Sequence, residues 1–186
     1  MKNNDDDISI VSIFWKSLLS IKYGEEDNEY DKFFDKLNDT TYVRTFFKEN
    51  ESFLENESFL ENEIWKNIPN IESATRQAIK EAEELEIFLE ELAINSENNE
   101  IPDLDSHFKY LDGEFKNVYE YTPVKSYGPG RPSLLRLYAI KLAPNKYVIT
   151  GGGIKLGDKI QTSPGIKDFV LKDIRRVRKY LTDNFS

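Results

Sequence analysis

A glutamate-rich segment from about residue 71 to residue 94 constrains the fold more than any other part of the sequence. It begins after Pro69, and Asn70 or Ser73 can cap its first turn. Its apolar side chains recur at helical spacing, which predicts one long amphipathic helix: Ile79, Ala82, Leu85, Phe88, Leu89 and Leu92. Its glutamates are interpreted as a solvated face and not as paired catalytic carboxylates: Glu81, Glu83, Glu84, Glu86, Glu90 and Glu91.

Strand-like runs lie on both sides of this helix. The segment ISIVSIFWKSLLSIKYG (8–24) predicts two strands, near 8–14 and 18–23, that pair as a hairpin. Three further runs follow the helix, separated by GPGRP and APN: NVYEYTPVKSY (117–127), SLLRLYAIKL (133–142) and KYVITGG (146–152). The short APN link predicts that the last two strands are antiparallel neighbours.

The remaining segments have helical spacing. Tyr30, Phe33, Phe34 and Leu37 indicate a helix after residue 27, and a second short helix is expected to follow Thr41. DSHFKYLD is expected to hold a helical turn. A final helix is expected from an apolar stripe near the end of the chain: Ile166, Phe169, Val170, Ile174, Val177 and Leu181.

This order of elements predicts an α+β fold. It has an N-terminal strand hairpin, a helical middle with one long amphipathic helix, C-terminal antiparallel strands and a final helix. We expect a single domain over residues 1–186, in which residues 40–100 form an acidic helical insertion.

The tandem copy ESFLENESFLEN, at 51–56 and 57–62, has a six-residue period that fits neither an α-helix nor a heptad seam. We interpret it as a slippage duplication that lengthened a helix or loop, with a partner-binding repeat as the alternative.

Charge divides the chain into two parts. Residues 1–120 carry 12 Lys/Arg against 30 Asp/Glu, whereas residues 121–186 carry 13 against 4. Since phosphates bind Lys and Arg, the basic part can form a polyanion site. The alternative, that it packs against the acidic part and neutralises it, stays open.

The sequence lacks the signatures of several classes of function. The chain has no cysteine and one histidine, His107, so thiolate zinc sites, a cysteine nucleophile and a two-histidine metal site are not expected. His107 is interpreted as a packing or surface residue, with a general-base role as the alternative. No apolar run is long enough for a signal peptide or a membrane span, which predicts a cytoplasmic protein without a membrane partner.

The glycine run in YVITGGGIK (147–155) is a candidate phosphate loop that fails the spacing tests. Leu156 stands where a P-loop that starts at Gly151 needs glycine, and it also replaces the third glycine of a dinucleotide fingerprint. We therefore expect no nucleotide cofactor, and no other cofactor or metal. The glycines are interpreted as structural, either for positive φ or for a close approach of another backbone.

A cluster of basic and aromatic residues is the strongest functional signal. Lys125, Tyr127 and Arg131 lie in or beside a Gly/Pro-rich loop, while Arg136 and Tyr138 share one face of a strand. Lys155 and Lys159 follow the glycines. In one sheet these residues would surround a shallow basic groove, where cations neutralise phosphates and tyrosines stack on bases. The alternative, core tyrosines with surface lysines, stays open.

The segments LLRLYAIKL and NKYVITGGGIKL resemble the C-terminal half of RelE/HigB-like toxins of type II toxin–antitoxin systems, especially their phage-type branch. The resemblance covers about residues 105–182. It implies a microbial-ribonuclease-like sheet and, in active members, metal-independent mRNA cleavage, often at the ribosome, neutralised by an antitoxin. By position, it implies catalytic roles for Arg136 and Lys155.

Two functions follow as hypotheses. The first is a toxin-like protein that cleaves or binds RNA, with RNA or the ribosome and an antitoxin as partners. Its RNA-binding residues would be Lys125, Tyr127, Arg131, Tyr138 and Lys159. The alternative is a non-enzymatic interaction protein of phage or mobile-element origin, whose acidic helical surface binds a protein partner.

Overall fold

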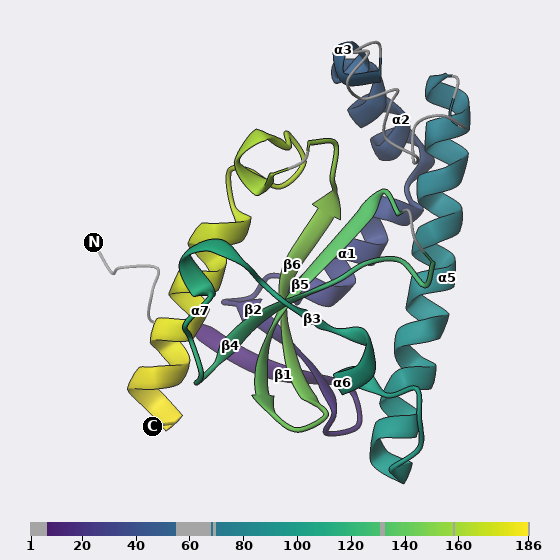
Figure 1. Cartoon of the computed structure of the whole chain (residues 1–186). Helices are drawn as coiled ribbons and strands as arrows, with labels where there is room; N and C mark the ends of the chain where they lie inside the picture. Colours follow the sequence, from purple (N-terminus) through teal and green to yellow (C-terminus); the bar gives the residue numbers. More distant parts are fainter. Residues whose placement is uncertain (1–6, 55–67, 69, 131–132, 158, 186) are drawn as a thin grey trace.

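The computed structural model of the chain describes residues 7–54, 68, 70–130, 133–157 and 159–185. Its strands are β1 (Ile8–Phe14), β2 (Leu18–Tyr23), β3 (Lys109–Tyr110), β4 (Thr122–Ser126), β5 (Leu135–Ala143) and β6 (Lys146–Ile154). Its helices are α1 (Glu29–Asn38), α2 (Thr40–Glu49), α3 (Glu51–Leu54), α5 (Ile71–Asn98), α6 (Leu104–His107) and α7 (Val170–Phe185). Short 3₁₀ turns lie at Gly113–Phe115 and Ile160–Thr162. The predicted α+β class is confirmed (Figure 1).

The strands form one mixed sheet in the order β1-β2-β6-β5-β4-β3. The predicted N-terminal hairpin is present, and its pairing runs from Ile8 opposite Tyr23 to Phe14 opposite Leu18. The predicted pairing of the last two long strands is also present, because β5 and β6 are antiparallel neighbours. Among the strands of the described residues, only β2 and β6 run parallel to each other. This pair joins the N-terminal hairpin to the C-terminal strands.

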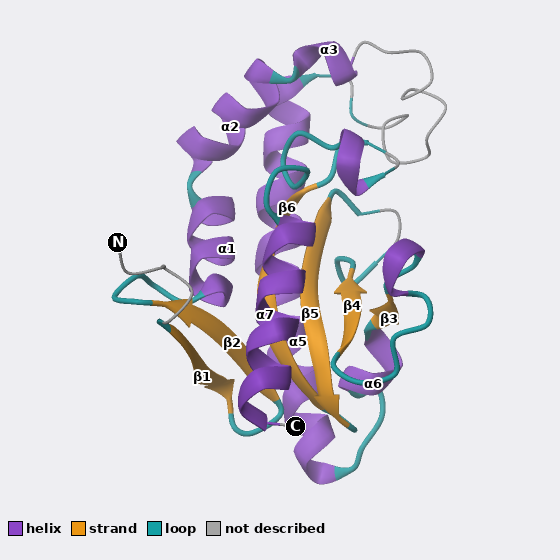
Figure 2. Cartoon of the chain, turned by 90° about the vertical axis from the view of Figure 1, so that its left-hand side faces the viewer, coloured by secondary structure: helices purple, strands orange, loops and turns teal. Residues whose placement is uncertain are grey.

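Helices cover both faces of the sheet. Figures 1 and 2 show α7 on one face, with α1 and α5 on the other. Side chains alternate along β5 accordingly, since Leu137 joins the core cluster that contains α1 and α5 residues, whereas Tyr138 and Ile140 join clusters that contain α7 residues. The long helix therefore contributes a large part of the core on its side of the sheet.

Local capping fixes the helix starts. The side chains of Asn28 and Asp39 accept hydrogen bonds from the first-turn N–H groups of α1 and α2. The Asn70 side chain does the same for α5 by accepting from the backbone N–H of Ser73, so Asn70 is the cap. The predicted long helix is confirmed and extends further, to Asn98, where Asn99 in a left-handed conformation ends it.

Five expectations need correction or addition, or fall partly outside the described residues. Glu81 does not lie on a solvated face, because it is buried at 6% exposure. The strand expected over 117–127 is limited to β4. The helical turn expected in DSHFKYLD is present as part of α6, and the same segment also contributes the short strand β3. The final helix starts at Val170, so Ile166 and Phe169 precede it. Within the ESFLEN copies, residues 51–54 form α3 and residues 55–62 lie outside the described part.

Candidate nucleic-acid interface

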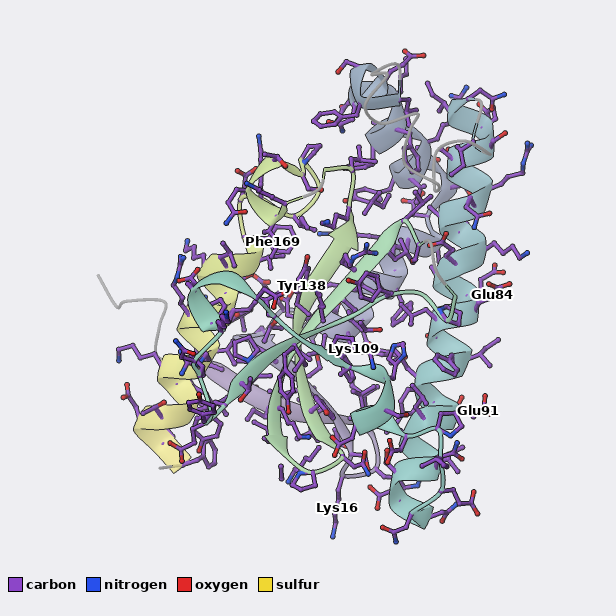
Figure 3. The ribbon with its side chains drawn as sticks, in the orientation of Figure 1. Lys16, Glu84, Glu91, Lys109, Tyr138 and Phe169 are labelled. Carbon is purple, nitrogen blue, oxygen red and sulfur yellow. The ribbon has the colours of Figure 1, made fainter. Side chains whose placement is uncertain are left out.

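Strand register brings lysines from two strands into one line. Lys109 in β3 lies opposite Lys125 in β4, and Lys125 lies opposite Tyr138 in β5. Directly opposed residues of antiparallel strands point to the same face, here the face covered by α7. Two lysines directly opposite each other repel, so an anion between or above them would relieve that repulsion. Figure 3 labels Lys109, on the edge strand β3, and Tyr138, on β5.

Tyr127 and Arg136 extend this line toward the loop between β4 and β5. The Arg136 guanidinium lies over the Tyr127 ring, 3.9 Å from its centroid, and Lys125 Nζ lies 5.9 Å from the same centroid. Arg136 also donates from one terminal nitrogen to the carbonyl oxygens of Ser133 and Leu135, at 2.9 and 2.6 Å. We call Lys109, Lys125, Tyr127 and Arg136 the basic row.

The loop between β4 and β5, which carries Tyr127 and leads into Arg136, is fixed to α5 by Glu81. One Glu81 carboxylate oxygen accepts hydrogen bonds from the Ser133 hydroxyl at 2.7 Å and from the Leu134 backbone N–H at 2.8 Å. The Ser133 hydroxyl in turn accepts from the Gly128 backbone N–H at 3.0 Å. A buried carboxylate of the long helix therefore positions both ends of the Gly/Pro-rich loop.

The remaining predicted residues are placed differently. Tyr138 is 1% exposed and packs among α7-side core residues, and burial raises its pKa, so its hydroxyl is neutral and its ring is not at the surface. Arg131 lies outside the described residues. Lys155 is partly buried, and its backbone N–H donates to the carbonyl of Leu134, which places it at the same end of the sheet as Arg136. Lys159 is exposed at the start of the turn Ile160–Thr162.

The glycine run is explained by backbone requirements. Gly151 has a φ of +140°, a value that side chains disfavour. A Cβ on Gly152 would come within 2.5 Å of the Arg136 carbonyl oxygen and 2.7 Å of the Phe33 ring. Backbone conformation at Gly151 and packing at Gly152 therefore favour glycine over other residues, which agrees with the structural interpretation.

His107 is packed. Its Nε2 lies 2.5 Å from the Ser126 hydroxyl oxygen, and its ring meets Phe88 and Phe108 edge-on. Since the Ser126 hydroxyl donates to the Tyr127 carbonyl, we assign the Nε2 proton to His107 as donor. The histidine side chain thus donates a hydrogen bond to the last residue of β4, next to Tyr127.

The fold also assembles a titratable cluster that sequence reasoning missed. A hollow of about 420 Å³ is lined by residues of the β2 end, the α1 start and α7, among them Tyr23, Glu29, Lys32, Asp173 and Arg176. Burial, followed by the charge of Glu29, raises the pKa of Asp173 to about 6. The Arg176 guanidinium lies 4.4 Å from the centroid of the Tyr23 ring, and Lys32 Nζ lies 2.9 Å from Glu29. Cations and carboxylates are thus mixed, which suits a structural polar cluster or an acid–base site.

Ion pairs join the basic and acidic parts of the chain. They connect Arg175 to Glu114 at 2.5 Å, Lys141 to Asp105 at 2.8 Å and Lys125 to Asp112 at 4.0 Å. Part of the basic charge is therefore neutralised within the fold, as the alternative interpretation expected. Asp112 is 92% exposed, so solvent weakens its effect on Lys125.

In comparisons with known proteins, no family model, curated protein or solved structure matches the chain. Within the described ranges, no group of three or more His, Asp or Glu side chains is arranged to hold a metal ion. The helices of the same ranges include none whose length and apolar character would let it cross a membrane.

Proposed function

We propose that the chain is a toxin-like RNA-directed protein, as its resemblance to RelE/HigB-like toxins implies, and that the basic row contacts RNA phosphates. The observation that carries this proposal is the direct opposition of Lys109 and Lys125 across β3 and β4. Lys109 Nζ donates to the Ser106 carbonyl at 2.9 Å, and Lys125 Nζ lies 4.0 Å from the exposed Asp112. A phosphate near both ammonium groups would relieve the repulsion that remains between them.

The other two members of the row suit single-stranded RNA. A guanidinium stacked on a tyrosine ring presents a flat cationic surface on which a base can stack, while its N–H groups reach phosphate. RNA in a single strand, free or on the ribosome, offers such unstacked bases. Lys155 and Arg136 are the candidates for charge stabilisation at phosphorus if the bound RNA is cleaved.

Salt dependence of binding tests the phosphate contacts. We expect the purified chain to bind a single-stranded RNA oligonucleotide with an affinity that falls as salt rises, by about 0.7 in the logarithmic slope for each phosphate contact. Lys125→Ala and Lys109→Ala should each reduce that slope by about this amount. Lys80→Ala is the matched control, because Lys80 is a 68% exposed lysine on α5. Equal losses for all three variants, or no RNA binding, would contradict the proposal.

Expression separates binding from toxicity. We expect the chain alone to arrest bacterial growth, and a neighbouring small protein to relieve the arrest. Arg136→Ala and Lys155→Ala should restore growth, and loss of intact mRNA before arrest would identify cleavage. Arrest with intact mRNA would identify binding to RNA or the ribosome, whereas harmless expression would count against both.

A further inference from the structure

Four carboxylates gather on the face opposite the basic row without a cation. Asp31 and Asp35 lie one turn apart on α1, and Glu86 and Glu90 lie one turn apart on the neighbouring helix α5. Burial, followed by the charges of Asp35, Asp31 and Glu90, raises the pKa of Glu86, so the four groups lie within electrostatic reach of one another. Across the described ranges, none of the four takes part in an ion pair. We call these four residues the acidic face.

A buried hydroxyl lies beneath the acidic face. Tyr30 is 3% exposed, and its hydroxyl is buried without a hydrogen-bond partner among the described residues. Burial raises the pKa of Tyr30, and the charges of Glu86, Asp31 and Glu90 raise it further, which places the hydroxyl near these carboxylates. Leaving such a group unpaired is costly, and in the described part of the chain the negative charge of the acidic face above it is not offset by a cation.

An exposed tryptophan is linked to Tyr30 through Phe14. Trp15, in the turn between β1 and β2, is 52% exposed and has a φ of +51°, a conformation that a bulky residue rarely adopts. Its ring meets Phe14, and the Phe14 ring meets Tyr30 edge-on, with centroid distances of 6.2 and 5.8 Å. An exposed indole is the best aromatic surface for a cation and a frequent centre of protein interfaces.

We propose that the acidic face and Trp15 form a docking surface for a basic segment of a partner protein. Arginine or lysine side chains of the segment pair with the four carboxylates, and one guanidinium stacks on Trp15. Charge complementarity selects this partner, since the same surface repels nucleic acid. The proposal does not depend on RNA binding, because the basic row lies on the α7 face.

Two variants of equal charge test it. Glu86→Gln/Glu90→Gln neutralises two carboxylates of the acidic face, and Glu84→Gln/Glu91→Gln neutralises two on the outer side of the same helix (Figure 3). The probe is a short labelled peptide of alternating arginine and alanine, followed by fluorescence anisotropy. We expect the first variant to weaken binding by about tenfold and the second to change it by less than about twofold. Trp15→Ala should also weaken binding, with a larger effect for arginine than for lysine peptides.

Three results would overturn the proposal. The first is no binding of the peptide, and the second is equal weakening of binding by both double variants. The third is a dimer of the chain that separates into monomers on Glu86→Gln/Glu90→Gln substitution, because a second copy of the chain would then occupy the surface. Thermal unfolding controls for folding, and the first variant should be at least as stable as the natural chain because it removes repulsion. RNA binding by the same variant should be retained, so the two proposals can fail separately.

Discussion

Removal of the Glu81 carboxylate is expected to destabilise the fold and to disable the basic row together. In Glu81→Ala the Ser133 hydroxyl and the Leu134 N–H lose their acceptor, and both residues are buried, at 2% and 0% exposure. Hydrogen bonds to a charged group contribute about 1.5–3 kcal/mol each. Ser133 can rotate toward another acceptor, and the buried charge disappears with its own desolvation cost, so we expect a net loss of about 2–3 kcal/mol.

Urea unfolding followed by circular dichroism measures this loss. Glu84→Ala is the matched control on the same helix. The Glu84 carboxylate is half-exposed, and its ion pair with Lys80, at 3.7 Å, is exposed to solvent and contributes little. This variant should change stability by less than about 0.5 kcal/mol. Glu81→Gln keeps an acceptor oxygen and should lie between the two. RNA affinity of Glu81→Ala should fall under conditions where the variant remains folded. If Glu81→Ala is as stable as the control, the anchoring role of Glu81 is wrong.

Three further changes test other parts of the fold by urea unfolding. Gly152→Ala should lose about 2–4 kcal/mol because its Cβ meets the Arg136 carbonyl oxygen, whereas Gly130→Ala, with open space around it, should be nearly neutral. Asp173 has a pKa raised to about 6, so ionisation costs stability as pH rises from about 4 to 6. Asp173→Asn should therefore be about 1 kcal/mol more stable than the natural chain near pH 7.5, after solvent screening, and equal to it near pH 4. For Asp105, burial raises the pKa, but hydrogen bonds from Lys141 and Tyr147 outweigh it and lower the pKa overall. Asp105→Asn should thus cost about 1 kcal/mol near pH 7, and the difference should shrink only as pH falls below about 4, the ordinary aspartate pKa, because the pKa of the folded carboxyl is lower still. A difference that does not change with pH would contradict either assignment.

The sequence predicts elements whose signals are local. Alternating apolar residues and Gly24 define the N-terminal hairpin, and Asn70 together with the 3.6-residue period defines the start of α5. The strand β3 escapes prediction because two residues carry no period, and it exists only through its pairing with β4. The end of α5 is predicted too early because the residues before Asn99 are mostly polar and show no helical spacing of apolar side chains.

Candidate sites depend on register and tertiary contact, which sequence spacing does not contain. Lys109 becomes part of the basic row only through its position opposite Lys125. Glu81 resembles its neighbours in sequence, and only the packing of α5 against the β4–β5 loop makes it a buried anchor. Asp173 and Glu29 come close together because the start of α1, the start of α7 and the end of β2 line the same hollow.

The acidic face and the basic row lie on different layers of the fold, although other acidic and basic residues of the chain form ion pairs. The acidic face lies on the helical layer of α1 and α5, and the basic row lies on the strand face covered by α7 (Figures 1 and 2). Between them is an apolar layer, which includes Leu85, Leu89 and Leu137 at 0% exposure. The acidic face and the basic row are held apart by this layer, so they cannot pair with each other, and the two proposed partners would bind to separate surfaces. A basic protein segment and an RNA phosphate backbone would then bind at the same time, and raising salt should weaken both interactions while a substitution on one surface leaves the other intact.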